Sequence, residues 1–125
     1  VTKLDSARAM IYTTARAIDS GQVKASRCRR MASESKKFVT EQCWDVANLA
    51  MQVMGGIGYT DVYPIEKIVR DLRLSSIWVG TNEIMSLIIQ HEYYRERLAE
   101  IADGAKRNSE LDALNAFAEG EKIYE

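Results

Sequence analysis

The sequence predicts an all-α protein, an up-and-down bundle of three long helices with a short crossing helix. Apolar residues recur at three- and four-residue steps through most of the chain, which is the period of a helix packed on one face. The only proline and four of the seven glycines fall between residues 52 and 90. There they mark two breaks, QVMGG and WVGTNE, on either side of a short amphipathic segment. This use of glycine indicates sharp turns or close approach of the backbone to another group.

Length and composition exclude several classes of function. A chain of 125 residues is one domain by length. Its 17 basic and 18 acidic residues give a net charge of −1, so no nucleic-acid partner is predicted. Cys28 and Cys43 are too few for a disulfide framework or a zinc site, and no metal site is expected. A reducing compartment, cytoplasmic or the mitochondrial matrix of a eukaryote, is therefore the default. No apolar run approaches the ~20 residues that a membrane span needs.

The first helix is predicted at about residues 3–20, and Gly21 supplies its C-terminal stop. Its apolar face is Leu4, Ala7, Ile11, Thr14, Ala15 and Ile18. Val1 is not an initiator methionine, and the helical pattern has already begun at residues 2–5. We therefore expect the chain to be a fragment with an upstream part.

Residues 22–54 are predicted to form a second helix of about 45 Å. Small and polar residues interrupt its apolar seam, which favours close packing against neighbouring helices over an isolated coiled coil. Cations mark one face near its start: Lys24, Arg27, Arg30 and Lys37. A phosphate site is one interpretation, but a solvated face paired with acids such as Asp19 is favoured.

Gly55 and Gly56 end the second helix, and with Gly58 they exceed what a glycine cap requires. Pro64 begins a short helix at about 64–73. Its inward residues are expected to be Ile65, Ile68, Val69 and Leu72. Glu66 and Arg70 stand in the favourable order for a side-chain pair, and Arg70–Asp71 is interpreted as a structural ion pair.

The last long helix is predicted to begin at the Gly80–Glu83 stretch, with Thr81 as N-cap, and to run to about Ala102. Its buried stripe is expected to be Ile84, Leu87, Ile88, His91 and Tyr94. The single histidine has no second His or Cys at ligand spacing, so no chemistry is assigned to it. Beyond Gly104, a capping box at residues 109–112 predicts a short helix that ends at Gly120.

The central stretch resembles the C-terminal helical domain of the acyl-CoA dehydrogenase family. The resemblance runs from Gln-x-x-Gly-Gly-x-Gly-Tyr through Tyr-Pro-x-Glu-Lys-x-x-Arg-Asp to Gly-Thr-Asn-Glu-Ile, in the family's order and spacing. It covers about residues 1–98, as a bundle that lacks its first helix. Residues 99–125 would form a helical C-terminal extension. The family's amino-terminal helical domain and middle β-domain would lie upstream.

The resemblance implies a flavoenzyme that removes two hydrogens from the α and β carbons of an acyl-CoA thioester. Such enzymes use FAD, are commonly tetramers, and usually pass electrons to an electron-transferring flavoprotein. By position, one segment matches the element that meets the FAD of a neighbouring subunit: Gln52, Val53, Met54, Gly55 and Gly56. Thr81, Asn82 and Glu83 match a second FAD-contacting element. Trp78 matches an aromatic wall of the acyl pocket, and Val79 and Gly80 match substrate-contacting positions.

The physical chemistry of these residues agrees with the resemblance. Gly55 and Gly56 can present backbone N–H groups to a pyrophosphate with no Cβ in the way. The helix that starts after Thr81 is expected to offer further unpaired N–H groups. Val79 occupies the place where many family members carry the glutamate that abstracts the α proton. Valine cannot accept a proton, so no catalytic residue is assigned here. In branches that resemble the isovaleryl-CoA and long-chain types, the base lies on the preceding bundle helix.

Three functions remain open: part of an FAD-dependent acyl-CoA dehydrogenase, a non-catalytic helical oligomerisation module, or a related FAD enzyme with another substrate. Glycine beyond the needs of a cap favours the first. The chain alone is expected to be inactive, to retain no FAD, and to self-associate through an uncovered apolar face. Acyl chain length, branching and the electron acceptor are not indicated.

Overall fold

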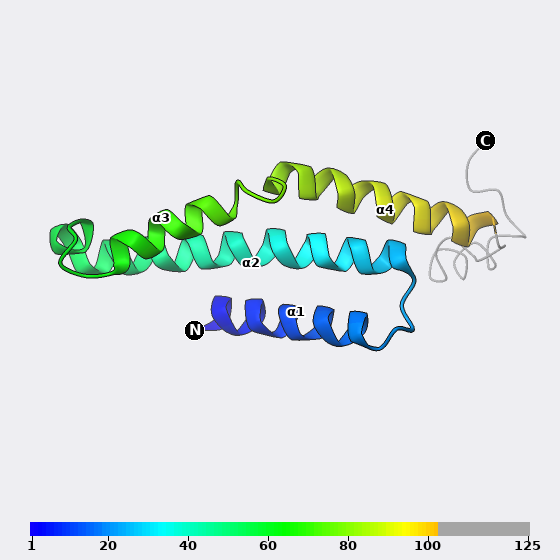
Figure 1. The fold of residues 1–125 in the computed structure, drawn as a ribbon, viewed down its shortest axis with the longest axis horizontal. Coiled ribbons are helices and arrows are strands. Elements are labelled where there is room, and N and C mark those ends of the chain that lie inside the picture. The colour runs from blue at the N-terminus through cyan, green and yellow to red at the C-terminus, as the bar shows by residue number, and fades with distance from the viewer. Residues whose placement is uncertain (103–125) are drawn as a thin grey trace, which may run out of the picture. The chain divides into compact units, whose positions relative to one another are not determined.

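The computed structural model describes residues 1–102, and every regular element among them is helical, which confirms the predicted all-α class (Figure 1). The elements are α1 (Thr2–Asp19), α2 (Ala25–Met54), the 3-10 helix η1 (Gly55–Tyr59), α3 (Ile65–Ser75) and α4 (Asn82–Ala102). The helix predicted from residue 109 to Gly120 lies outside the described residues. Residues 1–92 form one compact unit, and the end of α4 from Tyr93 belongs to a second.

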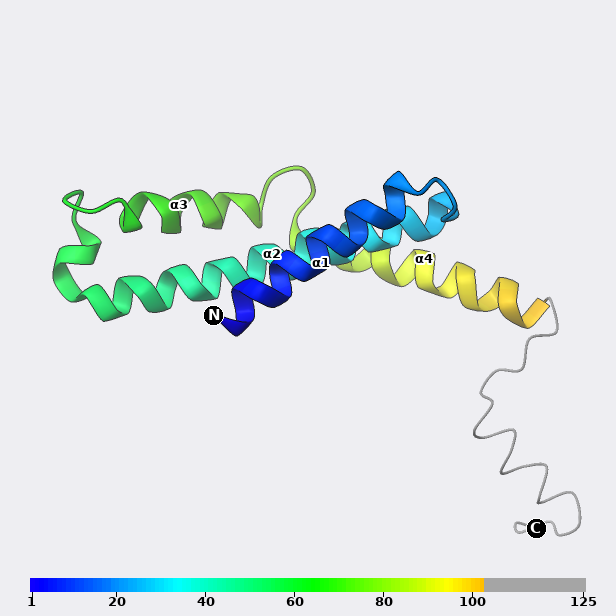
Figure 2. The ribbon, with the colours of Figure 1, turned by 90° about the horizontal axis from the view of Figure 1, so that it is seen from below.

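Helix α2 is the central element of the first unit, and α1 packs along one side of it (Figures 1 and 2). The two helices run antiparallel, since the Lys3 ammonium near the start of α1 lies 2.6 Å from the Asp45 carboxylate late in α2. The buried residues of α1 and of the second half of α2 are small: Ala7, Thr14 and Ala47. Small side chains let two helix backbones approach closely, so the close packing predicted from the interrupted seam is confirmed.

Helix α3 and the first part of α4, up to Glu92, follow one another along α2 in the opposite direction to it (Figure 1). The Arg73 guanidinium of α3 lies 5.7 Å from the centre of the Trp44 ring on α2. The start of α4 lies near the middle of α2, where Lys36 Nζ is 2.8 Å from Asn82 Oδ1. The prediction that the short helix crosses the bundle is therefore wrong. The chain between α3 and α4 is short, and it lets both helices use the same side of α2.

The helix ends are close to those predicted. Gly21 and Gly55 both take a φ of 66°, which glycine adopts without steric cost. The second helix begins at Ala25, three residues later than predicted, because the chain from Gly21 to Lys24 is used to turn between α1 and α2. Pro64 stands just before the first residue of α3, so the short helix starts one residue later than expected.

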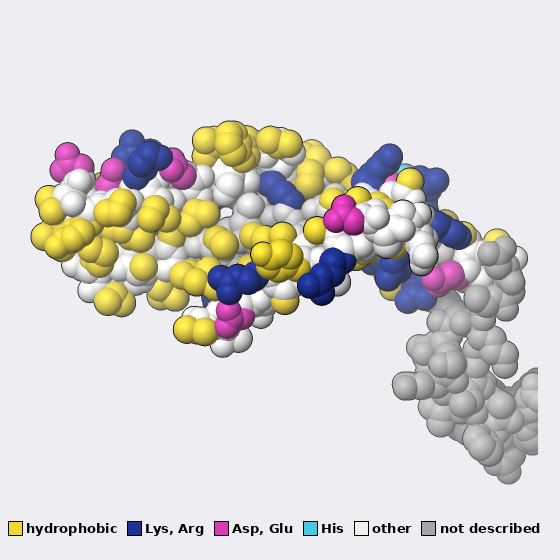
Figure 3. Space-filling model, turned by 60° about the horizontal axis from the view of Figure 1, so that its bottom comes forward, with side chains coloured by type: hydrophobic (Ala, Val, Ile, Leu, Met, Phe, Trp, Pro, Cys, Tyr) yellow, Lys and Arg dark blue, Asp and Glu magenta, His cyan; other side chains and the backbone are white. Residues whose placement is uncertain are grey.

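Much of the apolar surface of the first unit is exposed (Figure 3). The stripe expected to be buried on the last helix is largely uncovered, with Ile84 46% and Leu87 59% exposed. His91 is exposed as well, and Ile68 of α3 is not inward-facing. These burial predictions are wrong for the single chain. Among the described residues, α2 is the main neighbour of the outer helices, and only the short η1 also contacts α3. The remaining faces therefore have no described helix to cover them.

Two of the four cations on the charged face of α2 pair with acids of the same helix. Arg30 bonds Glu34 over 3.1 Å, and Lys37 bonds Glu41. The preference for a paired, solvated face over a phosphate site agrees with these contacts. On α3 the predicted Glu66–Arg70 pair is confirmed. The other predicted pair there differs, because Asp71 bonds Lys67, one helical turn earlier. No helix in the described part of the chain has the length and apolarity to cross a membrane.

Candidate functional site

The glycine element that follows α2 contains two kinds of glycine. A Cβ placed on Gly55 or Gly56 would meet no atom within 4 Å, and both residues are exposed. A Cβ on Gly58 would lie 2.8 Å from Met54 Cβ and 3.2 Å from the Met51 carbonyl oxygen. Gly58 is therefore required by packing inside the chain. The first two glycines leave open space, so their backbone is accessible to a ligand.

The residues before these glycines lie at the exposed end of α2. Gln52 is exposed, Val53 is 88% exposed and Met54 is half-buried. Gly55 has φ 66° and ψ −151°, a conformation open essentially only to glycine. Its N–H bonds back to the carbonyls of the last turn, so the expectation that Gly55 offers a free N–H to a phosphate is wrong. The sequence thus ends α2 with a turn that displays this element on the surface.

The second candidate element is the turn from Ser76 to Asn82. The Asn82 N–H donates to the Ser76 carbonyl over 3.1 Å and closes the turn. Inside it Val79 has a φ of 53° and Gly80 a φ of 92°. A positive φ at a β-branched residue is a genuine outlier, and such strain tends to persist at functional sites. Val79 is 88% exposed and Trp78 is 55% exposed, so the turn presents both side chains outward.

Asn82 belongs to the interior of this turn. Asn82 is only 7% exposed, and its side chain points to α2. There Nδ2 donates to Thr40 Oγ1 over 3.0 Å, and Oδ1 accepts from Lys36 Nζ over 2.8 Å. Lys36 also donates to the Gly80 carbonyl over 2.9 Å. The sequence prediction placed Asn82 at the cofactor, and the geometry makes its side chain an anchor of the turn.

Thr81 is the N-cap of α4, as predicted, since its Oγ1 accepts the Ile84 N–H over 3.3 Å. The Met85 N–H bonds to the Thr81 carbonyl, and the Asn82 N–H is taken by Ser76. The Glu83 carboxyl accepts hydrogen bonds from its own backbone N–H and from the Thr81 hydroxyl, which lower its pKa. The expectation of unpaired N–H groups at this helix start is therefore wrong, because the chain itself occupies them.

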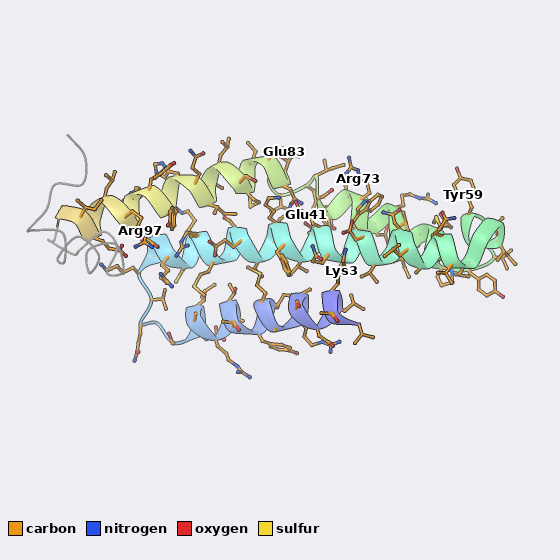
Figure 4. The ribbon with its side chains drawn as sticks, turned by 180° about the vertical axis from the view of Figure 1, so that it is seen from behind. Lys3, Glu41, Tyr59, Arg73, Glu83 and Arg97 are labelled. Carbon is orange, nitrogen blue, oxygen red and sulfur yellow. The ribbon has the colours of Figure 1, made fainter. Side chains whose placement is uncertain are left out.

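A pocket of about 200 Å³ lies beside this element, between α2, the end of α3 and the start of α4. Its wall includes Trp44, Arg73 and Thr81 together with the carboxylates of Glu41 and Glu83. Figure 4 shows Glu41, Arg73 and Glu83 gathered near the middle of α2. The carboxylates of Glu41 and Glu83 give this wall hydrogen-bond acceptors, so the pocket can bind hydroxyl or amide groups.

The two candidate elements lie at different places along α2. Tyr59, which ends the glycine element, lies at the far end of that helix, whereas Glu83 lies near its middle (Figure 4). Fifteen residues separate Thr40, which holds Asn82, from Gly55, about 22 Å at the rise of an α-helix. One chain therefore offers two separate contact surfaces rather than one assembled site.

Sequence reasoning missed Lys36 and Thr40. Both lie inside a long helix with no local motif, and their partners are more than 40 residues away. Only the fold brings them together. His91 lines an open pocket of about 410 Å³ with Arg29 and Ile84. Within residues 1–102, no group of three or more His, Cys, Asp or Glu side chains is placed to hold a metal ion.

Known proteins are similar to this chain in sequence and in fold. The model of the acyl-CoA dehydrogenase C-terminal domain matches residues 1–94. A cyclohexane-1-carbonyl-CoA dehydrogenase of Geobacter metallireducens is 37% identical over 95 residues, which are 76% of this chain and 24% of that protein. The mitochondrial isovaleryl-CoA dehydrogenase of Oryza sativa is also 37% identical over 95 residues, covering 76% of this chain and 22% of the relative.

Among solved structures, a chain from the study of the electron transferring flavoprotein of Acidaminococcus fermentans and flavin-based electron bifurcation superposes with a TM-score of 0.68. It is 30% identical, and the match covers 75% of this chain and 24% of that one. The chain thus spans about a quarter of the length of the relatives it matches. Over residues 1–94 it belongs to the acyl-CoA dehydrogenase family, as the C-terminal domain.

Proposed function

We propose that this chain is the C-terminal part of an FAD-dependent acyl-CoA dehydrogenase that oxidises the α,β bond of an acyl-CoA thioester. The observation that carries the proposal is the exposed, strained turn at Val79, found in a member of this family at the position expected to meet the thioester. A module that served only for assembly would have no need to keep a valine at positive φ.

The residues of the glycine element fit the flavin cofactor on steric grounds. Gly55 and Gly56 have open space where a Cβ would stand, so a phosphate group can approach their backbone. Gln52, Val53 and Met54 flank that surface. When bound, FAD accepts the two electrons removed from the substrate. The role of this chain is to hold one end of the cofactor and exclude water from it.

Thr81, Asn82 and Glu83 would hold a different part of the cofactor. The carboxylate of Glu83 is ionised more readily than usual because hydrogen bonds lower its pKa. It repels phosphate and accepts hydrogen bonds from hydroxyl groups. We therefore assign this element to the hydroxyl-bearing part of FAD, and the glycine element to the phosphates of another FAD molecule. The two elements meet α2 at places about 22 Å apart along it, which suits an assembly in which each chain serves two cofactors.

The turn itself would bind the substrate. The Val79 N–H would donate to the thioester carbonyl and acidify the α carbon, with Gly80 allowing close approach and Trp78 forming a wall of the acyl pocket. A backbone donor of this kind does not depend on the side chain. The Val79 side chain has no proton acceptor, so we assign the base to a carboxylate elsewhere in the full-length protein.

Assembly and electron transfer follow from the same proposal. The uncovered apolar faces of α1, α3 and α4 would be buried against other parts of the full-length protein and its copies, in a homotetramer. An electron-transferring flavoprotein would take the electrons. Two free cysteines, Cys28 and Cys43, suit a reducing compartment, the cytoplasm or a mitochondrial matrix.

The test uses the full-length protein that carries this chain. We expect a bound-flavin absorbance spectrum and oxidation of at least one acyl-CoA in a panel of chain lengths, with a dye as electron acceptor. Gly56→Glu should lower flavin retention at least tenfold, because it places a negative charge where the phosphates would lie. Gln22→Glu adds the same charge at another exposed position and should retain the flavin. A colourless, assembled and inactive full-length protein would instead support the oligomerisation module.

A further inference from the structure

Lys36 makes an unusual pair of contacts for a lysine in the middle of a helix. Its ammonium donates to the Gly80 carbonyl over 2.9 Å and to Asn82 Oδ1 over 2.8 Å. Neither partner is a carboxylate. Burial lowers the pKa of Lys36, although Glu83 and Glu41 nearby act in the opposite direction. The chain thus holds a cation in a partly buried place in order to bind a backbone carbonyl and an amide.

The partners of Lys36 lie on either side of the strained residue. Gly80 directly follows Val79, and Asn82 closes the turn through its bond to Ser76. Val79 is 88% exposed, so no packing of its own side chain can hold its φ at 53°. A strained backbone persists only where its surroundings determine it. Here the surroundings are the Ser76–Asn82 bond and the contacts from α2.

We propose that Lys36 is a positioning residue, which clamps the Ser76–Asn82 turn to α2 and thereby aims the Val79 N–H at the thioester. The aiming of the Val79 N–H at the thioester rests on the proposed function, whereas the attachment of the turn to α2 by Lys36 does not. One ammonium bonds two groups on the turn, one at Gly80 and one at Asn82. Loss of the ammonium leaves both acceptors without this donor and frees Val79 to relax.

The neighbouring Lys37 provides a matched control. It lies on the same helix, one residue away, and bonds Glu41 within α2 rather than the turn. Lys36→Met keeps the length of the side chain and removes the charge and donors. Lys36→Arg keeps both and tests rescue. Lys37→Met removes a charge that bonds neither Gly80 nor Asn82 directly, although its partner Glu41 also lies 3.5 Å from Asn82 Nδ2.

The experiment measures amide hydrogen exchange of the peptide that spans residues 76–83 in the full-length protein. It also measures the affinity for a non-reactive thioether analogue of acyl-CoA. Lys36→Met should raise exchange in this peptide at least tenfold and weaken the analogue at least tenfold. Lys37→Met should leave both unchanged, and Lys36→Arg should recover most of each. The Lys36→Met protein should keep its far-ultraviolet circular dichroism, which shows that the helices remain folded.

The outcomes separate the clamp from the proposed function. Unchanged exchange in Lys36→Met overturns the clamp, whatever the affinity. Faster exchange with unchanged affinity for the analogue overturns the aiming of Val79. If the unmodified protein binds neither flavin nor analogue, the proposed function fails, and the exchange measurement alone still decides whether Lys36 holds the turn. A loss in Lys37→Met equal to that in Lys36→Met would also count against the proposal.

Discussion

The backbone N–H of Asn82 donates to the carbonyl oxygen of Ser76 across 3.1 Å, and this bond closes a turn in which Val79 holds a φ of 53°. Among the described residues, Val79 is the only non-glycine residue with a positive φ. A β-branched side chain in that region costs of order 1–3 kcal/mol. The turn therefore stores strain at the position that we assign to the substrate.

Val79→Gly should leave the free energy of unfolding unchanged or raise it by up to ~2.5 kcal/mol. The strain is removed, while the added freedom of glycine in the unfolded chain costs roughly 0.5–1 kcal/mol. Val62→Gly is the matched control, since Val62 is also an exposed loop valine but has a negative φ. It should destabilise by about 0.5–1 kcal/mol. Urea unfolding of the three proteins gives the comparison, and an equal loss in both variants would refute the strain.

Gly58→Ala and Gly56→Ala should differ sharply in stability. An alanine at 58 places its Cβ against Met54 Cβ and the Met51 carbonyl, so η1 must shift, at a cost of about 1–3 kcal/mol. An alanine at 56 meets open space and has no positive φ to violate, so stability should change by less than ~0.5 kcal/mol. Thermal unfolding of both variants tests this. Similar losses at the two positions would mean that the packing around Gly58 is not as described.

Glu83 should contribute stability that disappears in acid. Its pKa in the folded chain is lowered by its own backbone N–H and the Thr81 hydroxyl. A lowered carboxyl pKa means that the unfolded state takes up protons first as pH falls. The contribution is then fully present above the ordinary value of 4.5 and is lost as pH falls through the folded value.

The measurement compares Glu83→Gln with the unmodified protein from pH 7 down to pH 3. The unmodified protein should be the more stable at pH 7, and the difference should shrink below pH 4.5 as its carboxyl becomes protonated. Asp61→Asn serves as the control, because it removes the carboxylate of an exposed loop residue away from the N-cap. A stability difference for Glu83→Gln that is the same at every pH would exclude the electrostatic origin.

The helices could be predicted because their signals are local. Apolar spacing, Gly21, Gly55 and the Thr81 N-cap each act within a few residues, and the observed helix ends lie within three residues of those expected. Burial could not be predicted in the same way. The stripe through Leu87 was expected to be covered, but a helix face is buried only if another element reaches it, and the described chain supplies α2 alone.

The residues of the candidate site also fall into those with a local signal and those that depend on long-range contacts. Gly55 and Gly56 were found from their residue type and Trp78 from the family resemblance, and all three lie exposed, as a ligand-facing surface requires. The roles of Lys36 and Thr40 depend on contacts across more than 40 residues, which no local pattern encodes. The N–H groups at the start of α4 were expected to be free. The closing bond from Ser76 and the carboxylate of Glu83 occupy them, and neither contact follows from a capping motif alone.

The last prediction concerns the proton acceptor. Abstraction of the α proton needs a carboxylate within about 3 Å in a plausible pose, and apolar surroundings raise its pKa toward neutrality. The Val79 side chain is apolar and exposed beside the proposed thioester position, so it would help to form such surroundings for a glutamate on another helix of the full-length protein. Changing that glutamate to glutamine should lower kcat ~100-fold or more. Val79→Ala should lower kcat much less.

Val79→Glu in the glutamine background should restore part of the activity, because it returns a carboxylate to the side of the thioester where many family members carry it. Normal kcat in the glutamine variant would contradict this assignment of the base. So would a double variant, with Val79→Glu added, that is as inactive as the glutamine variant alone.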